Sequence, residues 1–140
     1  MIETGGVEVR TAVVASPQTW GAATTVTEAR AAFLDDHVHM LLLTDGDVLV
    51  GTVVRDDLLG APAGDPALRH AVLTGRTVAP DAPAEGVRRA MLDRGERRLA
   101  VVDGAGRLVG LLCLKRHGGG FCRDEDVRAR RRERHSADVA

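Results

Sequence analysis

The chain repeats one pattern of residues, and this internal repeat limits the possible folds more than any other feature of the sequence. Residues 32–46 resemble residues 90–104 at a separation of 58, and residues 49–54 resemble residues 108–113 at a separation of 59. The additional residue of the second copy falls in a predicted turn, where an insertion is tolerated best. The repeat therefore predicts two small units of similar architecture.

Both copies predict the same order of secondary-structure elements, which makes the expected fold class α+β. A short strand leads to a helix of about ten residues, and two apolar strands joined by a tight turn follow. In copy one Thr25 and Glu28 form the pattern of a capping box, and in copy two Pro83 suits the first turn of the helix. Asp-Gly in both turns is a strong hairpin signal. The expected strands are 19–21, 39–44 and 48–54 in copy one, and 76–79, 98–102 and 108–114 in copy two.

The later strands of each copy are nearly continuous hydrophobic runs, so we expect both of their faces to be covered. Between the copies, residues 60–64 predict a linker, and Asp65 and Pro66 predict the start of a further helix that ends near Leu73. Residues 118–120 are three consecutive glycines. The charged segment that follows them predicts an exposed helix or a disordered tail.

The composition excludes several classes of protein. Trp20, Phe33 and Phe121 are the only aromatic residues, which argues against a stacking platform for single-stranded nucleic acid or sugars. No apolar stretch approaches the ~18 residues of a membrane span, and the N-terminus does not have the pattern of a secretory signal. Cys113 and Cys122 do not make a disulfide framework, so we expect a reduced, cytoplasmic protein.

A β-α-β-β-α unit that occurs twice and ends in Gly-apolar-apolar resembles a tandem pair of cystathionine-β-synthase (CBS) domains, called a Bateman module. The resemblance rests on residues 47–58 and on residues 97–103 with 106–110, and it covers roughly residues 7–117. It implies two CBS motifs packed with pseudo-twofold symmetry, and a cleft between the motifs that often binds AMP, ADP, ATP or S-adenosylmethionine. The expected domains are CBS motif 1 at 7–59, a linker and helix at 60–75, CBS motif 2 at 76–117 and a charged C-terminal tail at 118–140.

The ligand signature of this family is Gly-apolar-apolar-Thr/Ser-x-x-Asp, whose hydroxyl contacts phosphate and whose Asp accepts hydrogen bonds from ribose. In copy one, the resemblance places Asp57 at the Asp position and Val54 at the hydroxyl position. In copy two, Cys113 and Arg116 occupy these positions, so we do not expect copy two to hold ribose in the family manner. The candidate ligand-binding residues are Asp57, Val54, Arg55, Thr19, Trp20, Thr77, Val78, Arg97, Arg98 and Arg116.

The main candidates also have purely structural interpretations. Asp57 suits the N-terminal end of a helix, where the helix dipole stabilises a negative charge. Thr19 and Thr77 lie where the first strand of the family passes the cleft, but threonine is common in any strand. Arg97 and Arg98, together with Arg116, form either an anion-binding cluster or a solvated basic face.

Other chemistry is weakly indicated. Cys113, His117 and Cys122 suggest a metal or redox site, but three ligands at this spacing do not match a structural zinc site, so we expect no metal. A cysteine in a buried strand behaves as a small hydrophobic residue. The sequence contains no catalytic constellation, so we expect no enzyme activity. The Arg-rich residues 128–134 support at most non-specific contact with nucleic acid.

The favoured hypothesis is a stand-alone regulatory module that binds an adenosine-containing ligand in the cleft between the motifs and signals to an unidentified protein partner. The alternatives are a ligand-free dimeric interaction scaffold with degenerate nucleotide sites, and a nucleic-acid-associated protein that acts through its Arg-rich tail. Residues 1–60 have a net charge of −6 and residues 61–140 a net charge of +5. This asymmetry predicts a head-to-tail homodimer, in which opposite charges meet.

Overall fold

The structure is a computed structural model of the chain, and the residues that it describes are 7–122. Its described residues divide into two compact units. The copy-one unit contains residues 18–77 and 102–108, and the copy-two unit contains residues 7–17, 78–101 and 109–122. The fold is α+β, as the repeat predicts, with a three-stranded sheet associated with each copy.

The copy-one unit is built on the sheet β1-β2-β3, in which β1 runs parallel and β3 antiparallel to the central strand β2. Leu41, Leu42 and Leu43 of β2 are all almost fully buried, which confirms that both faces of this strand are covered. A two-residue turn at Gly46 and Asp47 joins β2 to β3. The elements of this unit are β1 (Trp20–Gly21), α1 (Val26–Ala32), β2 (Leu41–Asp45), β3 (Val48–Val53), η2 (Arg55–Leu58) and η3 (Ala67–His70).

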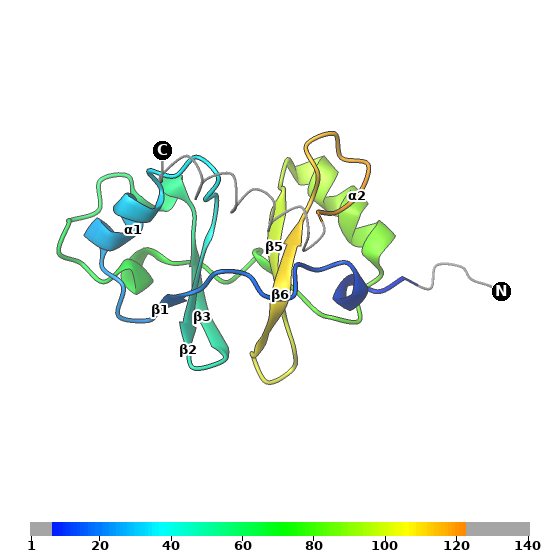
Figure 1. Cartoon of the computed structure of the whole chain (residues 1–140), viewed down its shortest axis with the longest axis horizontal. Coiled ribbons are helices and arrows are strands. Elements are labelled where there is room, and N and C mark those ends of the chain that lie inside the picture. The colour runs from blue at the N-terminus through cyan, green and yellow to red at the C-terminus, as the bar shows by residue number, and fades with distance from the viewer. Residues whose placement is uncertain (1–6, 123–140) are drawn as a thin grey trace, which may run out of the picture. The chain divides into compact units, whose positions relative to one another are not determined.

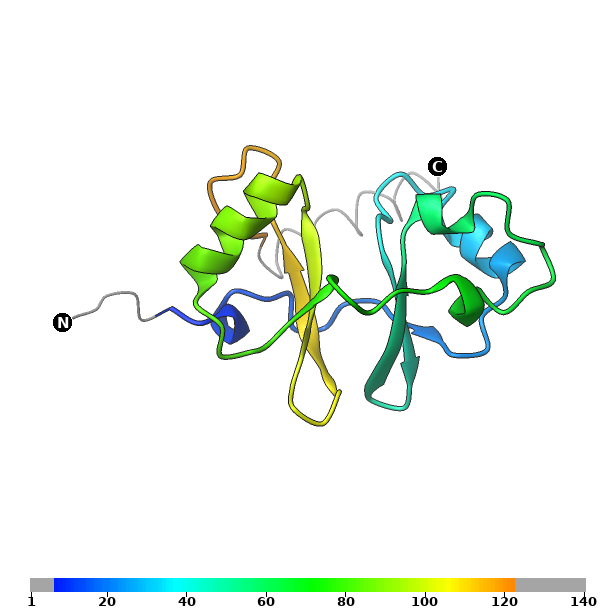
Figure 2. The same cartoon turned by 180° about the vertical axis from the view of Figure 1, so that it is seen from behind.

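Helix α1 begins where the sequence predicts, because Thr25 and Glu28 form the expected capping box. Glu28 N donates to Thr25 Oγ1 at 3.1 Å, and Thr25 N donates to Glu28 Oε1 at 2.9 Å. The buried face of α1 and the residue after it pack on one side of the sheet, beside η2 (Figure 1 and Figure 2). The core they form contains Val26, Ala29, Phe33, Leu41, Leu43, Val53, Leu58, Ala61 and Ala67.

The copy-two unit repeats this arrangement around α2, which packs beside β5 and β6 (Figure 1). Helix α2 ends at Gly95, whose φ of 69° is the left-handed conformation that commonly terminates a helix. The elements of this part of the chain are η1 (Val9–Thr11), β4 (Thr77–Val78), α2 (Ala84–Arg94), β5 (Arg98–Val102) and β6 (Leu108–Cys113), and the sheet order is β4-β5-β6. The core contains Val9, Met91, Leu99, Val101, Leu112 and Leu114.

The segment that precedes each copy in the sequence packs on the last strand of the other copy. Val14 forms an antiparallel bridge with Leu111 of β6, and Val72 forms the equivalent bridge with Thr52 of β3. Thr52 is fully buried, and its Oγ1 also donates to the carbonyl of Val72. Residues 7–17 therefore belong to the copy-two unit although they lie before copy one in the chain.

Three sequence predictions about helices are wrong in detail. The expected helix from Pro66 to Leu73 is only the short 3-10 helix η3, because Ala71 is extended and Val72 pairs with Thr52. Pro83 is the extended residue directly before α2, so it lies outside the first turn of the helix. The last helix of each CBS motif is reduced to the one-turn η2 in copy one and is replaced by turns after β6 in copy two. The predicted tail beyond residue 122 lies outside the described residues.

Candidate functional site

Asp57 is the centre of the candidate site, and it lies in the one-turn helix η2 directly after β3. Its carboxylate accepts two hydrogen bonds from the guanidinium of Arg76, from Nη1 at 2.5 Å and from Nη2 at 3.0 Å. It also accepts a hydrogen bond from the backbone N–H of Val54 at 2.8 Å. The Asp57 and Arg76 side chains are 14% and 21% exposed, so the pair is largely buried but still in contact with solvent. This two-pronged geometry is the strongest arrangement for an arginine and a carboxylate.

The environment of Asp57 keeps it ionised. Burial alone would raise its pKa, but the hydrogen bonds from Arg76 and Val54 and the positive charge of Arg76 outweigh burial and lower the pKa below its ordinary value of 3.8. Asp57 therefore presents a carboxylate at neutral pH, which is the form that accepts hydrogen bonds from the two hydroxyls of a ribose. Arg76 supplies the positive charge next to it.

Val54 and Arg55 both lie close to Asp57 in the sequence, but only Val54 forms a hydrogen bond with it. Val54 contributes its backbone N–H to Asp57, and no hydroxyl stands at this position. Arg55 donates from Nη2 to the carbonyls of Phe33 at 2.9 Å and Asp35 at 3.1 Å, and its guanidinium lies 5.1 Å from the centre of the Phe33 ring. Arg55 therefore ties η2 to the end of α1 rather than joining Asp57.

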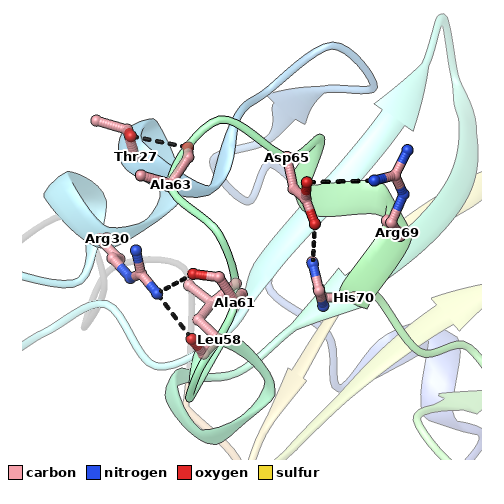
Figure 3. Close-up of polar contacts among 8 residues, drawn as sticks. All are labelled: Thr27, Arg30, Leu58, Ala61, Ala63, Asp65, Arg69 and His70. Atoms are coloured by element: carbon pink, nitrogen blue, oxygen red, sulfur yellow. Dashed lines mark hydrogen bonds and ion pairs between the residues drawn. The ribbon is translucent and has the colours of Figure 1, made fainter.

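Next to Arg55 the copy-one unit contains a cavity of about 250 Å³. Its walls combine two guanidinium groups with apolar side chains, and they are formed by Arg30, Phe33, Arg55, Leu58, Leu59 and Gly60. The Arg30 side chain is held in place at the cavity, because its Nη2 donates to the carbonyls of Leu58 at 3.0 Å and Ala61 at 2.6 Å. These bonds hold the end of η2 and the residues after it against α1, as Figure 3 shows.

The linker that follows η2 is held in place by polar contacts. Thr27 Oγ1 donates to the carbonyl of Ala63 at 2.9 Å, and Asp65 pairs with Arg69 at 3.2 Å and His70 at 2.9 Å (Figure 3). The Asp65 contacts lie within one short stretch of chain around η3. These contacts define the path of the linker that leads from η2 toward Arg76, and so they help to place the candidate site.

The predicted arginines of copy two do not reproduce this pair. Arg116, which occupies the position equivalent to Asp57, is exposed. Arg97 is half-buried and donates from Nη2 to the carbonyl of Leu114 at 3.1 Å, while its buried Nε has no hydrogen-bond partner within the described residues. Arg98 is half-buried in β5. At the position equivalent to Asp57, copy two therefore has the positive side chain of Arg116 instead of a carboxylate.

The remaining predicted residues lie in or next to the first strands. Thr19 is exposed directly before β1, and Trp20 in β1 packs against the core of the copy-one unit. Thr77 and Val78 form β4, where Thr77 directly follows Arg76 and Val78 packs against the core of the copy-two unit. Trp20 and Val78 thus each have a structural role in a core, in addition to the ligand contact that the sequence predicts for them.

Arg76 is the residue that sequence analysis missed. It appears in the repeat only as the counterpart of Gln18 and carries no motif of its own. The one signal for it is its position as the first residue of the predicted strand at 76–79. Its pairing with Asp57 across 19 residues depends on the path of the linker, which the sequence pattern does not determine.

Comparison with known proteins identifies the fold. The model of the CBS domain family matches residues 69–116. No curated protein sequence matches the chain significantly. No helix in residues 7–122 is long and apolar enough to cross a membrane.

Solved structures with CBS domains are similar over most of the chain. A CBS domain pair/ACT domain protein from Thermotoga maritima has 21% identity and a TM-score of 0.64, with 80% of this chain and 92% of that chain covered. CBSX2, solved in complex with AMP, has 24% identity and a TM-score of 0.67, with 81% and 92% covered. The cytosolic domain of the Mg²⁺ channel MgtE, solved in complex with ATP, has 28% identity and a TM-score of 0.54, with 68% and 41% covered. Residues 69–116 thus match the CBS domain family, and the chain has the fold of a CBS-domain pair.

Proposed function

We propose that this CBS-domain pair is a regulatory module that binds an adenosine-containing ligand at Asp57 and transmits the bound state to a partner protein. The observation that carries the proposal is the largely buried carboxylate of Asp57, held in its ionised form beside the guanidinium of Arg76. Two proteins of the same fold were solved with AMP and ATP, which supports an adenine nucleotide as the class of ligand. AMP, ADP, ATP and S-adenosylmethionine are the candidates.

The chemistry of the pair fits the two polar parts of a nucleotide. A carboxylate accepts hydrogen bonds from both hydroxyls of a ribose, and a guanidinium binds a phosphate through two donors. Asp57 and Arg76 present these groups side by side. Because the two side chains bond each other in this structure, the ligand has to replace part of their contact, so recognition of ribose and phosphate is coupled at this site.

Regulation follows from the effect of the ligand on the Asp57–Arg76 contact. Asp57 lies in η2, and Arg76 lies directly before β4, so within the copy-one unit the contact joins η2 to the segment that leads into β4. A ligand that binds one arrangement of this contact more tightly than another shifts the population toward it by its difference in affinity. The proposed activity is therefore regulatory and not catalytic.

The experiment is a thermal-shift series with AMP, ADP, ATP and S-adenosylmethionine on the wild type, Asp57→Ala and Asp56→Ala. A ligand present at 100 times its Kd stabilises the folded state by about 2.7 kcal/mol, which raises the Tm by several degrees. We expect this shift in the wild type and in Asp56→Ala, whose carboxylate is exposed and outside the site, and its loss in Asp57→Ala. A shift that Asp57→Ala retains in full would overturn the assignment of the site.

A protein-interaction scaffold without a nucleotide site is the second candidate function. The observation in its favour is that Arg76 and Val54 already provide Asp57 with hydrogen bonds, as in a structural ion pair. Val54 and Arg116 also lack the hydroxyl and the carboxylate of the family signature. If none of the four ligands changes the Tm of the wild type, the scaffold replaces the regulatory module as the function.

A further inference from the structure

The two cysteines of the chain meet in the copy-two unit. Cys113 is the last residue of β6, and Cys122 lies beyond the glycine-rich segment that follows it. Their Sγ atoms are 2.9 Å apart, and the two residues are 3% and 5% exposed. The spacing of nine residues does not predict this contact, because it depends on how the segment between them turns back.

The backbone makes Cys113 and Cys122 direct opposites in a small antiparallel hairpin. Leu114 and Phe121 form an antiparallel bridge, and Lys115 N donates to Gly120 O at 2.8 Å. Cys122 N donates to Cys113 O at 2.7 Å, one step further along the same ladder. Opposite residues in such a ladder have Cα atoms about 4.5–5.5 Å apart, which lies inside the range of about 4.4–6.8 Å that disulfides require. The backbone is therefore already in position for a bond between the two sulfurs.

The surroundings favour chemistry between the two sulfurs over metal binding. His117 lies between the cysteines in the sequence, but its Nδ1 accepts a hydrogen bond from Gly119 N at 3.0 Å. Within residues 7–122, no group of three or more His, Cys, Asp or Glu side chains is arranged to hold a metal ion. The hairpin is also anchored on α2, because Arg88 Nη1 donates to Gly118 O at 2.8 Å.

We propose that Cys113 and Cys122 are a thiol–disulfide modification site, with a small peroxide as the oxidant. One thiolate attacks a peroxide oxygen and becomes a sulfenic acid, and the leaving hydroxide takes up a proton to form water. The second thiol then attacks the sulfenic sulfur, the S–S bond forms, and its proton leaves with the hydroxyl group as a second water. The two sulfurs lose two electrons, and one hydrogen peroxide is reduced to two waters.

Burial determines how this site reacts. Both sulfurs are shielded from solvent, so the oxidant reaches them only when the hairpin opens locally. The disulfide closes a ring from residue 113 to residue 122, which restricts the unfolded chain and stabilises the folded one. The ring encloses Arg116, so oxidation also restrains one of the predicted anion-binding side chains. The proposal does not depend on ligand binding at Asp57.

The test is peptide mapping of the full chain after incubation in hydrogen peroxide or in dithiothreitol. Each sample is denatured in the presence of an alkylating reagent, which blocks free thiols, and is then cleaved with trypsin. Cleavage releases residues 108–115 and 117–123 as separate peptides that each contain one cysteine. We expect the peroxide sample to contain these two peptides joined within one chain and the dithiothreitol sample to contain both in alkylated form. Full alkylation of both cysteines in the peroxide sample, or a disulfide only between chains, would overturn the proposal.

A stability measurement separates the disulfide from other effects of the oxidant. We expect the oxidised wild type to melt several degrees above the reduced wild type, because the loop is closed. The variants Cys122→Ala and Cys113→Ala should melt at the same temperature in both conditions. A Tm difference that persists in these variants would show that peroxide acts elsewhere, and would contradict the proposed site.

Discussion

At the scale of single residues, the contact between Asp57 and Arg76 makes the stability of the protein depend on pH. The pKa of Asp57 is lowered in the fold, since the hydrogen bonds from Arg76 and Val54 outweigh the effect of burial. A carboxyl group with a lowered pKa stabilises the fold above its unfolded pKa, and this contribution disappears as the pH falls through the lower folded pKa. We expect Asp57→Asn to lose about 1–3 kcal/mol of unfolding free energy at pH 7, and progressively less as the pH is lowered below the ordinary pKa of 3.8.

Urea unfolding of the wild type and Asp57→Asn at neutral and at acidic pH measures this difference. Asp56→Asn is the matched control, because it removes the same charge from the neighbouring, exposed carboxylate. An equal loss at neutral and acidic pH in Asp57→Asn would show that the stabilisation does not come from the ionised pair. This experiment is independent of any ligand, so it tests the structural part of the site alone.

The same pair shows which part of the site sequence analysis could predict. Asp57 was predicted as a ligand-binding residue because it follows an apolar strand at the position where the family signature has an Asp. Its partner Arg76 was not predicted, since arginine is common in this chain and the pair joins residues 19 positions apart. Arg55 was predicted as a ligand contact, and it is held by two carbonyls and the Phe33 ring. Contacts between side chains on either side of a linker can be identified only once the path of the linker in the fold is known.

At the scale of elements, two equivalent glycines allow a segment to pack on the last strand of each unit. A Cβ added at Gly51 of β3 would lie 2.6 Å from the Cβ of Ala71, and one added at Gly110 of β6 would lie 2.7 Å from the carbonyl oxygen of Val14. Both distances are shorter than those between real Cβ atoms and their neighbours. Each neighbour is a backbone atom or a Cβ atom, so it cannot move away without moving the backbone. We expect Gly51→Ala and Gly110→Ala each to destabilise the fold by about 1–3 kcal/mol.

The control is Gly86→Ala in α2, where an added Cβ has no neighbour within 4 Å. This change replaces glycine with the best helix former at an exposed position, so it should stabilise the protein by up to about 1 kcal/mol. Chemical denaturation of the three variants gives the comparison. A neutral result for Gly51→Ala and Gly110→Ala would mean that these segments do not pack closely on β3 and β6.

The elements also show why some boundaries were predictable and others were not. The capping box of Thr25 and the Asp-Gly pair at Asp45 and Gly46 are local signals, and the helix start and the turn at Gly46 and Asp47 appear where these signals predict them. The helix expected after Pro66 is cut short because Val72 pairs with Thr52, which is 20 residues away. A pairing of this kind overrides local helix propensity and leaves no periodic trace in the sequence.

At the scale of the whole molecule, the separation of charge along the chain supports a proposal about assembly. Residues 1–60 carry nine acidic and three basic residues, whereas residues 61–140 carry eleven acidic and sixteen basic residues. In a head-to-tail homodimer, each half of one chain faces the half of opposite charge on its partner. In a head-to-head homodimer, like charges would meet, so electrostatics favours the first arrangement.

We expect this homodimer to weaken as salt is added, because the screening length falls from about 10 Å at 0.1 M to about 3 Å at 1 M ionic strength. Sedimentation equilibrium at the two salt concentrations measures the change in Kd. The direction of the dimer can be tested with Lys115, which is the only lysine of the chain. A carbodiimide joins its amine to a nearby carboxylate, and mixing ¹⁴N and ¹⁵N chains identifies the cross-links that form between chains. Links from Lys115 to carboxylates in residues 1–60 of the partner support the head-to-tail dimer, whereas links only to carboxylates in residues 61–140 contradict it.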